Sequence, residues 1–205
     1  LSAFADKEAD ILVGTQMIVK GHDFSDVTLV GILAADMSLY ADDYRAGERT
    51  FQLLTQAVGR SGRGDIEGEA VIQTYSPEHY AVETAAAQDY ETFYAEEIQY
   101  RKWMGYPPAE NLLAVLASGK EEAILETGCK YLKEFVTRFL GAGEIQIIGP
   151  ASPGIGKIND VYRRVLYIKA KRYDTLVGIK NRLEQYIEVN SGFAKMRIQF
   201  DFNPM

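Results

Sequence analysis

Two arginines in the first third of the chain have the type and spacing to act together on an anion. Arg60 and Arg63 lie in the run Gln-Ala-Val-Gly-Arg-Ser-Gly-Arg-Gly, residues 56–64, at the end of a helix predicted over residues 49–59. Residues three apart lie on the same side of a turn, so two planar guanidinium groups can converge on one polyanion. This pattern indicates a pair of arginine fingers that neutralise a transferred γ-phosphoryl group. A glycine-rich turn with two solvated arginines is the alternative.

A second polar segment, residues 11–24, precedes this run. The short apolar run 11–13 is predicted to be a strand that ends in Gly14, Thr15 and Gln16, and the next strand, 27–33, ends near Asp36. Ligands bind at the carboxyl edge of parallel sheets, so we expect these polar side chains to line a site there. Thr15 and Gln16 can donate hydrogen bonds to a phosphate backbone, whereas Asp23 suits hydroxyl groups or an arginine.

The elements that must position these residues follow an α/β order. The runs 11–13 and 27–33 are short and β-branched, which predicts buried parallel strands, and a further strand is predicted at 69–75. About three strands precede Pro77, whereas doubly wound sheets usually contain more. Residues 1–78 are therefore expected to be an α/β lobe that is incomplete at its N-terminus.

The next segment, residues 79–107, is predicted to be one helix that bridges two domains. Its aromatic and apolar residues recur at helical spacing among glutamates, and it ends at a Gly-Tyr-Pro-Pro stop: Tyr90, Phe93, Tyr94, Ile98 and Gly105 to Pro108. We expect this apolar stripe, and Trp103, to pack against protein rather than to stack on bases, because the acidic face would repel phosphate.

Residues 108–205 show a different order of elements. The pattern predicts a strand at 111–118, a helix at 121–140, strands at 145–149 and 161–170, a helix at 173–187 and a strand at 196–202. This βαββαβ order is typical of an α+β domain with one antiparallel sheet and both helices on one face.

Composition limits the classes of function. The chain of 205 residues has a formal net charge of −7, which argues against a uniformly basic nucleic-acid binder. Positive charge is concentrated locally in residues 157–172, whereas residues 83–97 are acidic. No apolar run is long enough to span a membrane and no leader peptide is evident, so the cytoplasm is the expected compartment.

Cysteine and histidine are too scarce to suggest a metal site or a disulfide. Cys129 is the single cysteine, and we expect it to be a small buried residue on a helix. His22 and His79 have no neighbouring ligand residues in the sequence. No metal is therefore expected in this chain.

Taken together, the two polar segments resemble motifs V and VI of superfamily-two helicases. Four segments are similar in sequence to those of the primosomal replication-restart DNA helicases, the primosomal protein N-prime family. They are Gly14-Thr-Gln-Met, Lys20-Gly-His-Asp-Phe24, and residues 27–31 and 48–54. The similarity continues through 73–75, 101–108 and the final Asp-Phe-Asn-Pro at 201–204. It is collinear over nearly the whole chain, which makes it specific.

The resemblance implies particular roles for these residues. Arg60 and Arg63 match the arginine fingers of motif VI, and residues 1–78 match part of the second RecA-like helicase lobe, with a three-layer parallel sheet. The nucleotide side would include Gln56, Gly21 and Asp23, and the single strand being tracked would contact Thr15, Gln16 and Lys20. In the family, the βαββαβ domain at 108–205 helps to bind branched DNA. The candidate surface is the basic stretch of Arg163, Arg164, Lys169, Lys171 and Arg172, although a solvated strand face is an equally good interpretation.

The same resemblance sets the expected cofactors and partners. The sequence contains neither G-x-x-x-x-G-K-[ST] nor an acidic D-E-x-H box, so ATP and Mg²⁺ would be bound mostly by an upstream lobe, and the fragment would be inactive alone. The zinc element of the family is also expected upstream. Expected partners are forked DNA, the single-strand DNA-binding protein and other primosome proteins, with no membrane. A non-catalytic module that docks DNA or protein is the alternative.

Overall fold

The chain folds into two compact units, Leu1–Glu97 and Ile98–Met205. The computed structural model describes residues 1–15, 17, 24, 26–41, 43–62, 68–139 and 145–204. The division between the units falls within helix α5 (Tyr90–Met104). Each unit has a hydrophobic core of its own.

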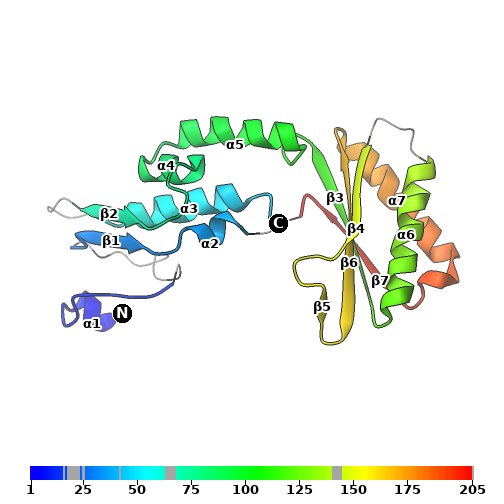
Figure 1. Cartoon of the computed structure of the whole chain (residues 1–205), viewed down its shortest axis with the longest axis horizontal. Helices are drawn as coiled ribbons and strands as arrows, with labels where there is room; N and C mark the ends of the chain where they lie inside the picture. Colours follow the sequence, from blue (N-terminus) through cyan, green and yellow to red (C-terminus); the bar gives the residue numbers. More distant parts are fainter. Residues whose placement is uncertain are drawn as a thin grey trace. The chain divides into compact units, whose positions relative to one another are not determined.

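The first unit is built on a small parallel sheet. Strands β1 (Leu29–Ile32) and β2 (Glu69–Ile72) pair in parallel with Leu29 opposite Glu69, and α2 (Asp36–Leu39) and α3 (Ala46–Val58) connect them (Figure 1). The apolar residues of α3 recur every three or four positions, which gives the helix one face to bury. That face packs against α4 (Tyr80–Ala86) and the start of α5, where the rings of Phe51 and Phe93 stack with centroids 4.1 Å apart.

Two predictions for this unit were wrong. Residues 11–13 form no strand, and Ile11 and Val13 are 79% and 85% exposed; the only α-helix before β1 in the described part of the unit is α1 (Ser2–Ala5). Strands β1 and β2 alternate between exposed and half-buried residues instead of being buried on both faces, and Leu29 is 61% exposed. Helix α3 covers one face of the pair, and no described element covers the other.

The predicted single helix over 79–107 is in fact two helices, α4 and α5. Gln88 adopts a left-handed conformation with φ of 53°, which ends the first helix. Asp89 then begins α5, because its carboxylate accepts hydrogen bonds from the backbone N and Oγ1 of Thr92 at 3.0 and 2.6 Å. The predicted packed stripe is also only partly present: Phe93 is buried, whereas Tyr94 and Trp103 are mostly exposed.

The second unit is an antiparallel sheet with two helices on one face (Figure 1). Its elements are β3 (Asn111–Gly119), α6 (Glu122–Phe139), β4 (Ile145–Ala151), β5 (Lys157–Ile158), β6 (Val161–Ala170), α7 (Tyr173–Val189), a 3₁₀ turn (Ser191–Phe193) and β7 (Arg197–Phe202). The strand order is β4-β6-β3-β7, with the two-residue β5 paired to β6 through a tight turn at Asn159 and Asp160, both at positive φ.

The core of the second unit lies between the sheet and the helices. Alternate residues of β3 and β6 meet residues spaced three or four apart on α6 and α7: Leu113, Val115, Leu166 and Ile168 with Leu132, Val136, Leu176, Ile179 and Leu183. The strand and helix ends differ from the predicted ones by two residues or fewer. Mixed α/β content with one parallel and one antiparallel sheet is therefore confirmed.

Candidate nucleotide and nucleic-acid sites

Arg60 lies where the chain turns away from the end of α3. Gly59 ends the helix, the backbone N of Arg60 donates to the carbonyl of Ala57 at 3.0 Å, and the Arg60 side chain is half-buried. Gly62 follows with φ of 68° and donates its N–H to the carbonyl of Val27 at 3.0 Å. Because Val27 leads into β1, Arg60 lies at the amino edge of the parallel pair.

The turn at Gly62 is held by close backbone packing. A Cβ atom placed on Gly68 would lie 2.1 Å from the backbone N of Gly62, so no larger residue fits at position 68 without moving the turn. This contact ties the start of β2 to the segment that carries Arg60. The glycines of this region therefore have a packing role as well as a conformational one.

Gln56 and Arg60 are close in sequence on either side of the end of α3. Gln56 lies in the last turn of α3, and Arg60 follows the end of the helix by two residues. Gln56 is exposed, which leaves its amide open to a ligand. Arg63 lies outside the described residues, so its position relative to Arg60 stays a prediction.

Of the first polar segment, the structure describes Thr15 but not its main neighbours. Thr15 is exposed, and its hydroxyl accepts a hydrogen bond from the backbone N of Met17 at 3.5 Å. The other residues expected to bind nucleotide or single-stranded DNA lie outside the described part of the chain: Gln16, Lys20, Gly21 and Asp23. Their roles stay predictions.

Asp36 occupies the carboxyl edge of the pair, opposite to Arg60. Its carboxylate accepts hydrogen bonds from the Thr74 hydroxyl at 2.8 Å and from the backbone N of Tyr75 at 3.0 Å. Desolvation raises the pKa of Asp36, but these hydrogen bonds together outweigh it and hold the pKa below its ordinary value. Asp36 thus links the ends of β1 and β2, a structural role that the sequence had not assigned.

Arg163 and Arg164 lie on opposite faces of β6. Successive residues of a strand point to opposite sides, and Arg164 shares the helix-covered side with Leu166 and Ile168. Its guanidinium donates to Glu122 at 2.6 Å and to Glu126 at 3.0 Å, and its side chain is only 11% exposed. The hydrogen bonds that the guanidinium donates to Glu126 and Glu122 raise the pKa of Arg164. A guanidinium engaged in this way is a cross-link between β6 and α6.

The remaining lysines of the basic stretch are also separated. Lys169 is 3% exposed; its Nζ donates to the carbonyl of Met104 at 2.7 Å and lies 3.9 Å from the Tyr106 ring centroid. Burial lowers the pKa of Lys169. Lys171 and Arg172 are exposed beyond the strand end, with Arg172 3.9 Å from Asp174. The open face of the sheet is the one opposite α6 and α7. Of the stretch, only Arg163 lies on this face with its side chain partly accessible.

His79 and Cys129, whose side chains could take part in metal or thiol chemistry, both have structural roles. His79 begins α4, where its Nδ1 accepts from the backbone N of Ala81 at 3.1 Å, and burial lowers its pKa. Cys129 is buried in α6, and desolvation raises the pKa of its thiol to about 11. Within the described ranges no three acidic, histidine or cysteine side chains gather as metal ligands. None of the helices described is both long and apolar enough to cross a bilayer.

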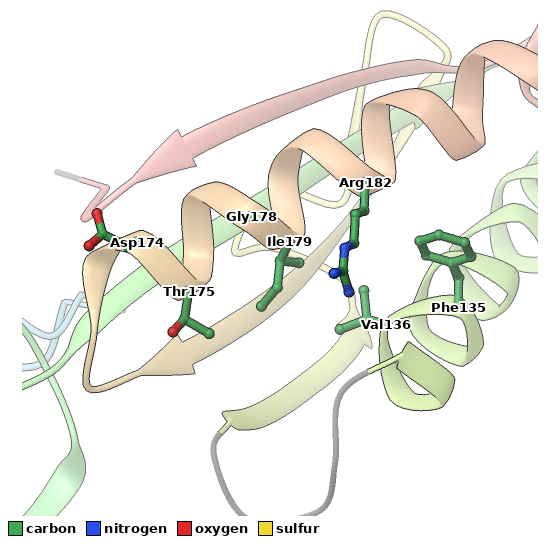
Figure 2. A pocket seen from close by; sticks show the side chains of 7 residues that line it. All are labelled: Phe135, Val136, Asp174, Thr175, Gly178, Ile179 and Arg182. Atoms are coloured by element: carbon green, nitrogen blue, oxygen red, sulfur yellow. The ribbon is translucent and has the colours of Figure 1, made fainter.

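Two shallow pockets lie between α6 and α7 of the second unit. The smaller, about 200 Å³, opens where α7 begins, with Arg182 and Phe135 near its far end (Figure 2); its lining is Phe135, Val136, Asp174, Thr175, Gly178, Ile179 and Arg182. The larger, about 490 Å³, lies toward the 3₁₀ turn, beside Tyr131 and Tyr186. No charged cluster that could bind a nucleotide lines either one.

Comparison with known proteins gives a consistent family assignment. Residues 102–205, slightly more than half of the chain, match the family described as Primosomal protein N C-terminal domain. The chain is 41% identical over 204 residues to Replication restart protein PriA of Bacillus subtilis, covering 100% of this chain and 25% of that protein. It is 38% identical over 202 residues to Replication restart protein PriA of Thermotoga maritima, covering 97% of this chain and 26% of that protein. The chain thus spans about a quarter of these relatives, and it belongs to the family of the primosomal protein N C-terminal domain.

Proposed function

We propose that this chain is the C-terminal part of an ATP-dependent 3′-to-5′ DNA helicase of superfamily two that acts in replication restart at stalled forks. The observation that carries the proposal is the collinear match over the whole chain to relatives named replication restart proteins. The first unit is then part of the second RecA-like lobe, and the second unit binds DNA and partner proteins. Those partners include the single-strand DNA-binding protein and other primosome proteins.

The end of α3 suits one half of a nucleotide site. Gln56 lies in the last turn of α3 and Arg60 just beyond its end, and the backbone contacts at Gly62 and Gly68 fix the turn that follows Arg60. The described residues provide no cluster of carboxylates to hold Mg²⁺. The residues therefore fit the arginine side of a site whose ATP and Mg²⁺ are bound mostly by an upstream lobe.

The reaction at this site would be ATP hydrolysis, in which water attacks the γ-phosphoryl group and the bond to ADP breaks. Arg60 donates hydrogen bonds to the phosphoryl oxygens, whose negative charge an arginine finger stabilises in the transition state. Arg63 supplies a second guanidinium, and Gln56 orients the nucleotide from the last turn of α3.

The proposal is tested in a chain extended upstream to include the missing lobe. Arg60→Ala and Arg63→Ala are each expected to lower DNA-stimulated ATP hydrolysis by about a thousandfold or more, with binding of forked DNA retained. Arg138→Ala is the matched control, because Arg138 is an exposed arginine on α6 of the second unit whose ion pair with Glu134 is long, 3.7 Å. Its turnover should equal that of the parent.

A different result selects the alternative function. If Arg60→Ala hydrolyses ATP as fast as the parent, the arginine-finger assignment is wrong. The chain would then be a non-catalytic module that docks DNA or protein. Equal losses in Arg60→Ala and Arg138→Ala would instead indicate a general effect of removing positive charge, and would also contradict the assignment.

A further inference from the structure

Three polar residues form a row across the antiparallel sheet of the second unit. The strand register places Ser118 of β3 opposite Arg163 of β6 on one side and opposite Arg197 of β7 on the other. Directly opposite residues on neighbouring strands point to the same face. The row therefore consists of two arginines with a hydroxyl between them, brought together from positions far apart in the sequence.

This row lies on the face of the sheet that the helices leave open. Ala117 of β3, Leu166 of β6 and Ile198 of β7 belong to the packed helix side. Alternation along each strand then directs Ser118, Arg163 and Arg197 to the opposite side. Arg164, by contrast, is on the helix side with its two glutamates.

The donors of the row are exposed in Arg197 and half-buried in Arg163 and Ser118, and they are largely uncommitted. Arg197 is exposed, and its guanidinium makes no ion pair or hydrogen bond with the described residues. Arg163 has one contact, 3.4 Å from its Nη1 to the carbonyl of Ile155, which leaves most of its five N–H donors available. Ser118 donates a long bond of 3.5 Å to the Arg197 carbonyl.

Nearby carboxylates are engaged with other cations. Asp160 pairs with Lys157 at 2.9 Å, and Glu121 pairs with Lys195 at 2.8 Å. Asp201 shares the open face of β7 but lies four residues from Arg197, roughly 13 Å along an extended strand. The end of the open face that carries the row is therefore positive, despite the net charge of −7 of the whole chain.

The geometry suits an extended, repeating anion. Neighbouring strands are about 4.8 Å apart, so the two arginine Cα atoms are separated by roughly 10 Å across β3. Two guanidinium groups at that spacing, with a hydroxyl donor between them, match several oxygens along one backbone better than a single carboxylate. Exposed Gln199 on β7 adds a donor on the same face.

We propose that the Arg163–Ser118–Arg197 row binds the phosphodiester backbone of single-stranded DNA. The proposal deepens the proposed function by locating the DNA contact of the second unit, and rests on it only for the choice of DNA among nucleic acids. The row also replaces the basic stretch of residues 163–172 as the candidate DNA-binding surface, because alternation along β6 places members of that stretch on two faces of the sheet.

The test is the affinity of the full chain for a fluorescent single-stranded oligonucleotide, measured by anisotropy at several salt concentrations without ATP. The double variant Arg163→Gln/Arg197→Gln should bind at least about tenfold more weakly, since each charged hydrogen bond lost contributes about that factor. Its plot of log affinity against log salt should be shallower by about 1.4, because each phosphate contact with a single strand contributes about 0.7.

The matched control is Lys130→Gln/Arg138→Gln, which removes the same charge from exposed positions on α6, on the other face of the sheet. It should keep the parent affinity and salt slope. Arg197→Lys should retain part of the affinity, because the charge is kept while the planar fork is lost. Circular dichroism of each variant verifies that the fold is unchanged.

Three outcomes would overturn the proposal. The first is equal loss in the two double variants, which would show a general charge effect. The second is an unchanged affinity in Arg163→Gln/Arg197→Gln. The third is displacement of the oligonucleotide by inorganic phosphate or by an oligoglutamate peptide, at constant ionic strength, as effectively as by unlabelled oligonucleotide.

Failure of this proposal is distinguishable from failure of the proposed function. The binding measurement involves neither ATP nor the first unit's arginines. If Arg60→Ala leaves ATP turnover intact but the row variant loses DNA, the helicase proposal fails and the row stands. If Arg60→Ala loses ATP turnover but the row variant still binds DNA like the parent, the helicase proposal stands and the row is not the DNA contact.

Discussion

The two units of this chain use the same kinds of residue with different results. In the second unit the central strands β3 and β6 pair on both sides, and their apolar residues are enclosed by α6 and α7. In the first unit β1 and β2 pair only with each other among the described residues, and their outer face remains exposed. The partners around a β-branched run thus decide whether it is buried as a strand.

The largest expected effect is the difference between shortening a buried side chain in the second unit and shortening an exposed side chain in the first. Ile168→Ala should lower the opening free energy of β3 and β6 by about 2–5 kcal/mol, because it leaves a cavity in a fully buried site. Leu29→Ala should change that of β1 by about 0.5 kcal/mol or less, since Leu29 is mostly exposed. Amide hydrogen exchange resolved by peptide measures both. Similar losses in the two units would contradict the comparison.

A smaller effect is expected from two glycines within the first unit. Gly68→Ala places a Cβ 2.1 Å from the backbone N of Gly62, and should destabilise the unit by about 1–3 kcal/mol. Gly31→Ala places its Cβ in open space within β1, and should stabilise the strand by about 0.5–1 kcal/mol. Urea unfolding followed by circular dichroism gives both values. A loss for Gly31→Ala as large as that for Gly68→Ala would show that the face of β1 is already covered.

The smallest effect concerns the charge of Lys169 in the second unit. Burial lowers its pKa in the folded state, so above that pKa the unfolded chain binds more protons and this residue's contribution to stability rises with pH. The rise ends near the unfolded pKa of about 10.4. The stability of the parent relative to Lys169→Met, followed by thermal melts, should therefore increase as alkaline pH approaches that value.

Lys157 provides a control of opposite sign. A hydrogen bond with Asp160 raises the pKa of Lys157, so its contribution is present below the unfolded pKa and is lost as pH rises through the folded pKa. The parent should therefore lose stability relative to Lys157→Met over the most alkaline part of the range. Parallel pH profiles for the two variants would sink the assignment of Lys169 as a buried ammonium group.

Much of the second unit was predictable because its signals are local and agree with one another. The helices bury residues at spacing three or four, as with Leu125, Cys129 and Leu132 in α6, and the strands alternate. The same rule of alternation separates Arg163 from Arg164, two members of the candidate basic surface for which a solvated strand face was the alternative. The break between α4 and α5 was missed because it depends on the Asp89 cap and the left-handed Gln88.

By itself the sequence determined the family, the candidate arginines at the end of α3 and the order of elements after Pro108, since motifs and periodicity are properties of neighbouring residues. Tertiary structure alone decided which of those side chains face one another. Arg197 lies opposite Ser118 because β7 pairs with β3, and Arg60 lies at the amino edge because Gly62 bonds to Val27. Strand register and long-range hydrogen bonds join residues that are distant along the chain, and no local pattern encodes them.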